Sequence, residues 1–423
     1  MEQPNLAMIP SGVKATKVYS IMPESGVGDF TFARSSTAYR LNKDGLWETS
    51  ASNLPRLHYD LSNGNPDSCP CLLLEPASTN ALGYSELFSS WGTTRSAIVA
   101  DSIMSPDGTV NASKMKDDGS TGTDTSQRFL SVIVANGSDY TFSVFAKKGS
   151  MDFVALRTGN FSNGGGTGET FFNLATGAVG TTYASHRPNI EKYPNGWYRC
   201  SIGFTAGTDL SGTVLIRQAS ANGTSTVPLD GNSFIYLWGA QFEQNSFATS
   251  YIKTTSNISS TRSAETCNSA GDASTFNSEE GILYAEIAAL ADDGTSRIIS
   301  LSDSSDTNRV HLFYNVSSNT VNVNYRVAGS SKAIMSFAVS DATIMQKIAY
   351  KWKSGNFELF VNGVNRGTSS NTTMMPANTM NQLAFNVGGS GLNFYGKCKD
   401  IRVYDTEGMT DTEITNLLTQ LTQ

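Results

Sequence analysis

The chain has 423 residues, enough for two or three domains, and a formal net charge of −7. Only 16% of the residues are charged, while Gly, Ser, Thr and Asn are abundant, which is typical of short strands joined by polar turns. The basic residues form no long run, which excludes the basic face that a nucleic-acid-binding protein needs. No apolar run approaches the roughly 18 residues of a membrane-spanning helix, which argues against membrane insertion.

The N-terminal 20 residues contain an early acid and no apolar core, so we expect no signal peptide and synthesis in a reducing cytoplasm. The five cysteines are an odd and scattered set, which does not indicate a disulfide framework. Cys69 and Cys71 form a C-x-C pair without a second pair at zinc-ribbon spacing, so we expect two packed thiols and no zinc site.

Residues 1–84 have alternating apolar residues and an Asp44-Gly45 turn, and we expect them to form a folded attachment region. Arg34, Arg40 and Arg56 lie among small polar residues of this region. Arginine suits internal or interface positions because its guanidinium reaches several carbonyls or carboxylates at once. The sequence leaves open whether these arginines are such groups or simply exposed.

Residues 85–253 contain a series of strand-like runs separated by Gly, Asn, Asp and Pro, a spacing that predicts a β-sandwich or jelly roll. These runs are YTFSVFAKK (140–148), FVALRT (153–158), WYRCSIGFT (197–205), TVLIRQAS (213–220) and FIYLWGAQFE (234–243). Residues 254–274 follow, rich in Ser and Thr, with Ile258 as their one large apolar side chain. We expect this segment to be a linker or an extended surface crossing because it has too little apolar surface to form a structural element of its own.

A second β series occupies residues 275–423 and predicts another sandwich. Within it, Ser354-Gly355 and Asn362-Gly363 predict the turns of two consecutive hairpins. Residues 409–421 predict one short amphipathic helix, with Thr410 or Asp411 as its cap. The whole pattern predicts an all-β protein of tandem antiparallel, jelly-roll-like sandwiches with an N-terminal attachment region and one short C-terminal helix.

Catalytic motifs are scarce, and we expect no enzyme. The three histidines are far apart in sequence, and the near P-loop GLNFYGKC (391–398) ends in Cys before a strand-like run instead of a helix. Hydrolysis of a glycosidic bond needs two carboxylates roughly 5–10 Å apart. Glu286 and Glu243 each lack a partner on their own strand, although a pair from different strands remains open.

A few residues are candidates for binding. Trp91 is the tryptophan we expect to be exposed, and an exposed ring can stack on a sugar. Asp303 and Asp306 lie in one acidic loop, and Asp292 and Asp293 lie in another. Both loops could hold calcium through oxygen ligands, or be solvated turns, and we expect no other cofactor.

Three stretches resemble a known group of proteins. The block from TFARSSTAYRLNKDGLWET through CLLLEPASTNAL to YSE (31–86) resembles the opening of bacteriophage virion structural proteins. GWYRCSIGFT and LWGAQFEQNSFATSYIKT (196–254), with the later TRSAE, resemble the carbohydrate-binding-module-like sandwich of the same proteins. The C-terminal stretch from YKWKSGNFELFVNGV to DTEITNLL (350–418) resembles the end of a laminin-G or concanavalin-A-like domain.

The resemblance implies a virion appendage, such as a fibre or decoration protein, that binds host-surface or mucus glycans without catalysis. Its partners would be other virion proteins and a host glycan, and by family analogy it would be a homotrimer. One alternative is a structural adaptor or decoration protein without a ligand. A further alternative is a glycan depolymerase. The resemblance brings no list of ligand residues, because the sugar-binding positions of such domains vary.

Overall fold

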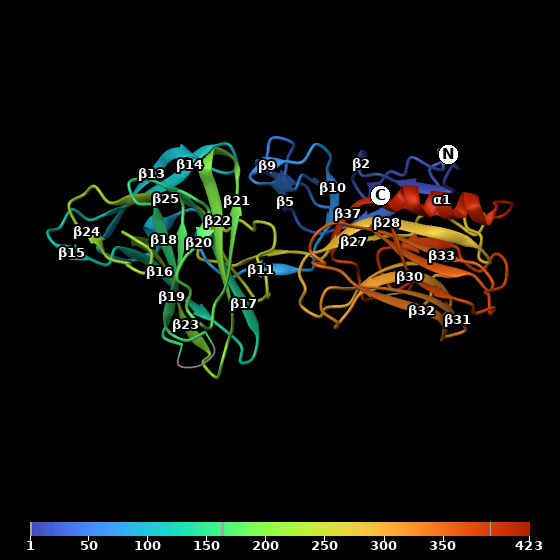
Figure 1. The fold of residues 1–423 in the computed structure, drawn as a ribbon. Helices are drawn as coiled ribbons and strands as arrows, with labels where there is room; N and C mark the ends of the chain where they lie inside the picture. Colours follow the sequence, from blue (N-terminus) through green and yellow to red (C-terminus); the bar gives the residue numbers. More distant parts are fainter. Residues whose placement is uncertain (1, 162–164, 390) are drawn as a thin grey trace.

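A computed structural model describes residues 2–161, 165–389 and 391–423. It consists of two β-sandwiches side by side, with the N-terminal region and residues 244–280 between and along them (Figure 1). The only α-helix of the described residues is α1 (Asp411–Thr422), near the C-terminus. The predicted fold class, all-β with tandem antiparallel sandwiches and one C-terminal helix, is confirmed.

The middle sandwich has two six-stranded antiparallel sheets around one apolar core. Its first sheet has the strand order β12 (Gly92–Thr94), β16 (Gln127–Ile133), β23 (Ser211–Ala219), β18 (Phe153–Gly159), β19 (Gly168–Asn173), β20 (Ala178–Val179). Its second sheet has the order β13 (Ser96–Met104), β14 (Val110–Asp117), β25 (Phe234–Glu243), β17 (Asp139–Lys148), β22 (Trp197–Thr205), β21 (Arg187–Lys192). Two short 3-10 helices, η1 (Phe88–Ser90) and η2 (Pro194–Gly196), precede β12 and β22.

The C-terminal sandwich packs a five-stranded sheet against an eight-stranded one. The five-stranded sheet has the order β32 (Ser330–Ala338), β31 (Thr320–Val327), β30 (Arg309–Tyr314), β29 (Arg297–Ser302), β36 (Gln382–Ala384). The eight-stranded sheet begins with β35 (Val364–Ser369), β34 (Phe357–Val361), β33 (Gln346–Trp352), β28 (Gly281–Ala289) and β37 (Gly396–Tyr404). The two predicted hairpins are the turns between β33, β34 and β35.

The N-terminal region completes this eight-stranded sheet. Its strands β1 (Leu6–Met8) and β10 (Cys71–Leu74) both pair with β37, and β7 (Arg56–His58) pairs with β10. Phe30 and Phe32 enter the core of the C-terminal sandwich, while Trp47 packs with Phe145 and Trp238 of the middle sandwich. The region therefore contributes to the apolar packing of both sandwiches.

The remaining strands form small sheets. A four-stranded sheet has the order β2 (Val13–Lys14), β3 (Lys17–Val18), β4 (Phe30–Ala33), β27 (Thr266–Asn268). The two-stranded pairs are β5 (Ala38–Leu41) with β6 (Trp47–Ser50), β8 (Leu61–Ser62) with β9 (Asn65–Pro66), β11 (Ser78–Asn80) with β26 (Ser260–Arg262), and β15 (Thr123–Asp124) with β24 (Val227–Pro228).

Residues 254–274 differ from the linker that we expected. They contain β26 and β27, which pair with strands of the N-terminal region, and Arg262 and Glu265 are both 1% exposed. The low apolar content misled the prediction because backbone pairing and buried ion pairs, together with the small buried side chains of Cys267 and Ala270, hold this segment in place.

Five buried charged side chains form one network where the N-terminal region meets this segment: Arg34, Arg56, Glu75, Arg262 and Glu265. Glu265 accepts hydrogen bonds from Arg34 Nη1 at 2.7 Å and from Nε of Arg56 at 2.9 Å. Glu75 accepts from Arg56 Nη1 at 2.7 Å and lies 3.1 Å from Nη1 of Arg262. Two of the three arginines of the N-terminal region are thus internal, while Arg40 pairs with Glu48 nearer the surface.

Backbone groups complete the network. The Ser250 amide donates to Glu75 at 2.8 Å, and the Glu75 amide donates to Glu265 at 2.9 Å. Burial alone would raise the pKa of Glu75, but Arg262 and Arg56 outweigh burial and hold that pKa well below its usual range. The network joins residues 56–75 to the end of the middle sandwich and to the segment that leads into the C-terminal one.

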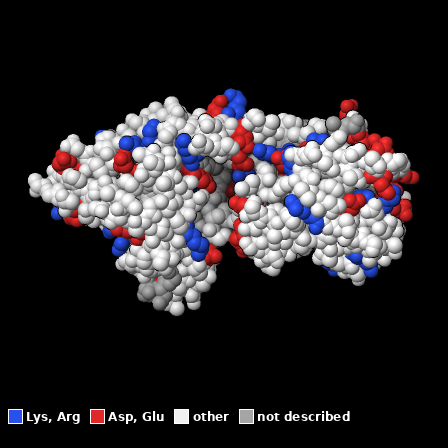
Figure 2. All heavy atoms as spheres, in the orientation of Figure 1, with Lys and Arg blue, Asp and Glu red and all other residues white. Residues whose placement is uncertain are grey.

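Acidic and basic side chains are interspersed over the face drawn in Figure 2. No helix in the described part of the chain is long and apolar enough to cross a membrane. Cys71 is buried as expected, but Cys69 is exposed, so the expectation of two packed thiols holds for one of them.

Candidate functional site

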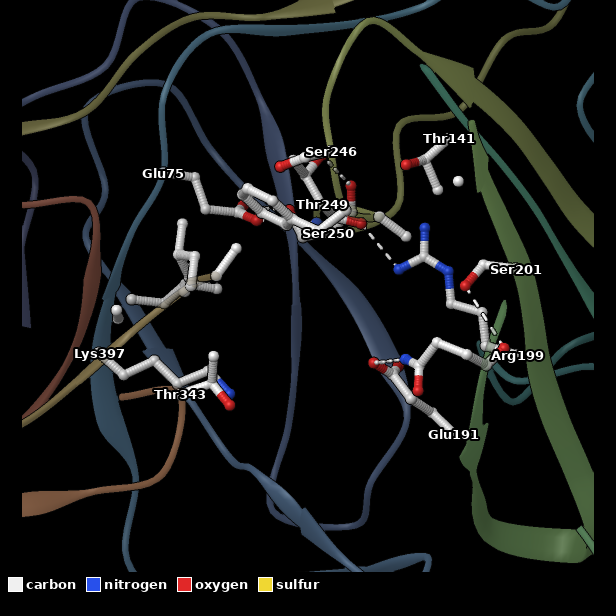
Figure 3. A pocket seen from close by; sticks show the side chains of 18 of the residues that line it. Glu75, Thr141, Glu191, Arg199, Ser201, Ser246, Thr249, Ser250, Thr343 and Lys397 are labelled. Atoms are coloured by element: carbon white, nitrogen blue, oxygen red, sulfur yellow. Dashed lines mark hydrogen bonds between the residues drawn. The ribbon is translucent and has the colours of Figure 1, made fainter. Parts of the chain in front are cut away.

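A cavity of about 570 Å³ lies where the N-terminal region and the two sandwiches meet, and we call it the cleft. Figure 2 shows the molecule hollowed between its two lobes, and Figure 3 shows the cleft from close by. A volume of this size falls in the ~300–1,000 Å³ range of small-molecule sites. A second cavity of about 390 Å³ shares His58, Glu191, Tyr193 and Lys397 with the cleft.

One wall of the cleft is the edge of the second sheet of the middle sandwich. Strands β21 and β22 place Asn189 opposite Ser201 and Glu191 opposite Arg199. Side chains two residues apart on a strand share a face, so Asn189 and Glu191 both face the cleft. In Figure 3, Glu191, Arg199 and Ser201 lie together on this wall, and Thr343 and Lys397 lie across the cavity.

The opposite wall comes from the C-terminal sandwich, which contributes Ala289–Asp292, Thr343 and Lys397. Residues 246–250, which follow β25, border both walls. Among them Phe247 is half-buried and lines the cleft, whereas Thr249 and Ser250 are buried in the charged network. The Ser246 hydroxyl also donates to Asp293 at 3.3 Å, across the two sandwiches.

Arg199 holds residues 249–250 in position. Its Nη1 donates to the Thr249 carbonyl at 2.7 Å and its Nη2 donates to the Ser143 hydroxyl at 3.1 Å. Its guanidinium lies over the Phe145 ring, 5.3 Å from the centroid. Because both terminal nitrogens bond to other parts of the protein, we infer that Arg199 positions residues 249–250 and does not itself bind a ligand.

Asn189 and Glu191 are exposed and weakly bonded. The Asn189 amide donates to Glu191 Oε1, and the Tyr193 hydroxyl donates to Glu191 Oε2, both at 3.3 Å. Among the residues that the structure describes, no Lys, Arg or His nitrogen lies within ion-pair distance of Glu191. The Glu191 carboxylate and the Asn189 amide can therefore accept and donate hydrogen bonds to a ligand.

The cleft is lined by equal numbers of acidic and basic side chains. Three acidic side chains, Glu75, Glu191 and Asp292, meet three basic ones, Arg187, Arg199 and Lys397. His58 is neutral because burial lowers its pKa to about 3, and its Nδ1 accepts the Leu41 amide at 3.2 Å. This balance favours a polar ligand without a large net charge.

The expectation that Trp91 is exposed is wrong. It is 3% exposed, its ring lies 5.2 Å from that of Phe88, and its indole nitrogen donates to the Tyr84 carbonyl at 3.1 Å. Helix η1 turns the chain so that both rings enter the core of the middle sandwich. The spacing of Phe88 and Trp91 by three residues was the available signal, because i and i+3 share one face of a 3-10 helix.

Asp303 and Asp306 lie in the turn from β29 to β30. Asp303 accepts from the Ser305 amide at 3.0 Å and from the Asn308 side chain at 2.8 Å, whereas the exposed Asp306 uses its carbonyl to accept from Arg309 at 2.6 Å. These bonds stabilise the turn, and a role of either aspartate in ligand binding stays a prediction.

Asp292 and Asp293 lie before β29, at the other end of this strand. Asp292 accepts the Asn319 amide at 3.0 Å, and Asp293 pairs with Arg297 at 2.8 Å. Because β29 has six residues, roughly 20 Å separates them from the Asp303 turn, so the two loops do not form one site. No group of three or more His, Cys, Asp and Glu within the described residues is arranged to hold a metal. Calcium binding stays a prediction.

The two carboxylates considered for hydrolysis are separate. Glu243 accepts from the Ser78 hydroxyl at 2.6 Å and from the Thr249 amide at 2.9 Å, and it is 1% exposed. Glu286 lies on β28 opposite Asp400, which Arg402 binds at 2.6 Å. Burial raises the pKa of Asp400, and Arg402 opposes that rise.

Sequence reasoning missed the residues that line the cleft, except Asp292, which it named only as a candidate calcium ligand. Asn189, Glu191 and Phe247 lie on two segments, and Asp292 and Thr343 lie on two others. In RPNIEK (187–192), polar residues occupy every second position, and this alternation indicates that one face of the strand is exposed to solvent. Nothing in the sequence indicated that this strand face would lie near residues of the C-terminal sandwich.

The chain was compared with curated proteins, solved structures and family models. No curated protein matches the chain. Among solved structures, the CBM40 of the Ruminococcus gnavus IT-sialidase bound to alpha2,3 sialyllactose is 16% identical, over 33% of this chain and 83% of that one, with a TM-score of 0.28. Domain 4 of AbnA, a GH43 extracellular arabinanase from Geobacillus stearothermophilus, in complex with arabinotriose, is 13% identical, over 38% and 73%, with a TM-score of 0.30. Mouse laminin alpha1 chain domains LG4-5 are 8% identical, over 65% and 85%, with a TM-score of 0.22.

The family comparison concerns the C-terminal sandwich. Residues 269–415 match the Laminin_G_3 model, described as the Concanavalin A-like lectin/glucanases superfamily. This range begins directly after β27 and ends within α1, so it contains the whole five-stranded sheet. The expectation that the C-terminal sandwich resembles a laminin-G or concanavalin A-like domain is confirmed by this match, which covers residues 269–415.

Proposed function

We propose that the protein binds neutral, hydroxyl-rich glycans in the cleft without catalysis. The observation that carries this proposal is the lining of the cleft, which combines the half-buried Phe247 ring with Asn189, Glu191 and Ser201 on one strand pair. Sugars present apolar ring faces and vicinal hydroxyls, which stack on aromatic rings and bond to amides and carboxylates. The balanced charge of the cleft supports a neutral ligand.

The absence of hydrolysis is part of the proposal. A glycosidase needs a carboxylic acid that is protonated near neutral pH. Glu75 in the cleft is ion-paired with Arg56 and Arg262, which lower its pKa, and Glu243 is bonded inside the fold. Neither residue suits the role of acid catalyst.

The setting we propose is a bacteriophage virion, where the protein would serve as a fibre or decoration component. The resemblance of residues 31–86 to phage virion proteins supports this setting. Other virion proteins would be its partners, and host-surface or mucus glycans its ligands. Several weak sites on one multimeric appendage would add up by multivalency, so each cleft need not bind tightly.

A glycan-array screen of the purified chain tests this function, with and without EDTA. We expect reproducible binding to a narrow set of neutral glycans and no release of reducing sugar from them. Loss of binding in EDTA would support a calcium site at the acidic loops. If folded protein binds no glycan on the array, a structural adaptor without a ligand is favoured. Release of reducing sugar would favour a depolymerase.

A further inference from the structure

One buried lysine of the C-terminal sandwich takes no part in the cleft. Lys351, on β33, is 1% exposed and lies directly opposite Glu358 on β34. Lysine is seldom fully buried, because its ammonium group then loses the hydration that water supplies. Neither residue lines the cleft or the second cavity.

The surroundings of Lys351 are apolar. Ala349 lies on the same face of β33, two residues before Lys351, and Phe360 lies opposite Ala349 on β34. Both belong to the apolar cluster that packs against α1, which lies along this sheet in Figure 1. On β28, Ile282 lies opposite Lys351 and is 0% exposed. Water therefore has little access to the ammonium group.

The turn between β33 and β34 places an asparagine beside this lysine. The Asn356 backbone amide donates to the Lys353 carbonyl at 2.9 Å, and the Gly355 amide donates to the Asn371 carbonyl at 2.8 Å. Gly355 has a positive φ of 73°, a conformation that glycine adopts at little cost. These bonds hold Asn356 at the turn, where it is half-buried.

Three side-chain groups are in mutual contact at this turn. Lys351 Nζ donates to Glu358 Oε1 at 2.8 Å. The Asn356 amide is oriented so that its oxygen accepts from Lys351 Nζ at 2.8 Å and its nitrogen donates to Glu358 Oε1 at 3.1 Å. The second carboxylate oxygen of Glu358 accepts from the Asn365 side chain at 3.0 Å, which orients the carboxylate. An amine, a carboxamide and a carboxylate thus meet inside the fold.

The contact contains the groups that an amide-exchange reaction requires. An amine in contact with a carboxamide oxygen lies close to the carboxamide carbon, and the fold holds both in place, which replaces a bimolecular encounter. Glu358 contacts both the attacking nitrogen and the nitrogen that leaves, so one carboxylate can carry protons between them. Joining Lys351 to Asn356 also replaces a buried ammonium by a neutral amide, which removes the cost of burying that charge.

We infer that Lys351 and Asn356 are joined by an isopeptide bond that the folded chain forms by itself, with Glu358 as the proton carrier. The Nζ lone pair forms a bond to Cγ of Asn356, and the bond from Cγ to Nδ2 breaks. Nζ loses two protons, and Glu358 passes them to the leaving nitrogen, which departs as ammonium. The step exchanges one amide for another and changes no oxidation state. The bond closes the turn covalently and does not depend on the function proposed for the cleft.

Mass spectrometry of the full chain tests the inference. The intact mass should fall below the mass of the sequence by one molecule of ammonia. Trypsin should release residues 348–353 joined to residues 354–366 as one branched peptide, because it does not cleave after an acylated lysine. Without the bond, the same digest gives residues 348–351, 352–353 and 354–366 as separate peptides.

Four variants test the roles of the individual groups, with tryptophan fluorescence as the check on folding. Lys351→Arg removes the attacking amine and Glu358→Gln removes the proton carrier, so both should lose the branched peptide and regain the full mass. Asn356→Asp should keep the bond, with water lost instead of ammonia. Lys353→Arg is the matched control, because Lys353 pairs with Glu280 at 2.9 Å, and it should keep the bond.

Three results would overturn the inference. One is a full intact mass and only the separate peptides from folded protein. Another is a branched peptide that persists in Glu358→Gln, because Glu358 would then not be the proton carrier. The third is loss of ammonia at Asn362-Gly363 without a branched peptide, because that loss reports a succinimide formed with the backbone and not a cross-link.

Discussion

Arg56 and Glu265 form a two-point pair, in which Nε donates to Oε1 at 2.9 Å and Nη2 donates to Oε2, although 209 positions separate them in sequence. Arg56 also binds Glu75, so one guanidinium joins two carboxylates from segments that flank the middle sandwich. Guanidinium suits this role because its fork matches the geometry of a carboxylate. The pair fixes where the chain leaves the middle sandwich and enters the C-terminal one.

Removing Arg56 should therefore destabilise the fold strongly. Arg56→Met leaves two buried carboxylates short of a cation, and breaking a buried pair from one side costs about 3–5 kcal/mol. Equilibrium unfolding in urea, followed by tryptophan fluorescence, measures the loss. Arg40→Met is the matched control, because Arg40 pairs with Glu48 near the surface and should cost at most about 1 kcal/mol. Equal effects of the two variants would contradict the structural role of the network.

Stability should fall as the solution becomes acidic, because buried histidines resist protonation. Burial lowers the pKa of His186 to about 4, and its ring nitrogens lie 2.9 Å from the hydroxyls of Thr158 and Thr170. The unfolded chain takes up the proton at about pH 6.5, so stability is lost as pH falls from there toward about 4, by at most ~1.4 kcal/mol per pH unit for each such histidine.

The variant His186→Gln should reduce this dependence. Thermal unfolding at neutral and at mildly acidic pH should give a smaller shift in midpoint for the variant than for the unaltered chain, whatever the variant's stability at neutral pH. Identical shifts would mean that His186 does not contribute, and that His58 and His311, whose pKa values are both lowered to about 3, carry the effect.

The C-terminal helix depends on its cap. The Thr410 hydroxyl accepts the Glu413 amide at 3.3 Å, and the Glu413 carboxylate accepts the Thr410 amide at 2.8 Å. Thr410→Ala should cost about 1 kcal/mol of unfolding free energy because it removes this capping box. Thr412→Ala, at an exposed position inside the helix, should be neutral or slightly stabilising. A neutral result for Thr410→Ala in urea unfolding would show that the packing of α1 alone determines its stability.

The predicted homotrimer has a direct test. Size-exclusion chromatography with light scattering at micromolar concentration should give three times the chain mass of 45.3 kDa. A monomer from folded, intact protein would contradict the trimer and would leave multivalency to a larger assembly.

The sequence predicted best those features that local chemistry determines. The cap at Thr410 and the spacing of Ile414, Leu417 and Leu418 predicted α1, and these three side chains are buried. The turns at Ser354-Gly355 and Asn362-Gly363 are also local, since glycine there adopts a positive φ of 73° and 81°. Such signals act over a few residues and can be read from one chain.

Features that depend on distant contacts escaped prediction. Arg262 and Glu265 lie in a segment with little apolar surface, and their partners are near residues 34, 56 and 75. Trp91 looked exposed because its flanking residues are small and polar, yet η1 turns its ring inward. The cleft combines residues from three parts of the chain, so no local pattern could bring Glu191 together with Asp292.

The most direct test of the central claim is the affinity of the best neutral glycan from the array, measured by titration calorimetry for three variants. Glu191→Gln and Phe247→Ala alter the cleft, whereas Glu407→Gln alters an exposed carboxylate elsewhere. We predict that each cleft variant binds about tenfold more weakly, a loss of about 1.4 kcal/mol, with little change in unfolding midpoint, and that Glu407→Gln binds normally. Unchanged binding by both cleft variants would contradict the assignment of the cleft as the glycan site.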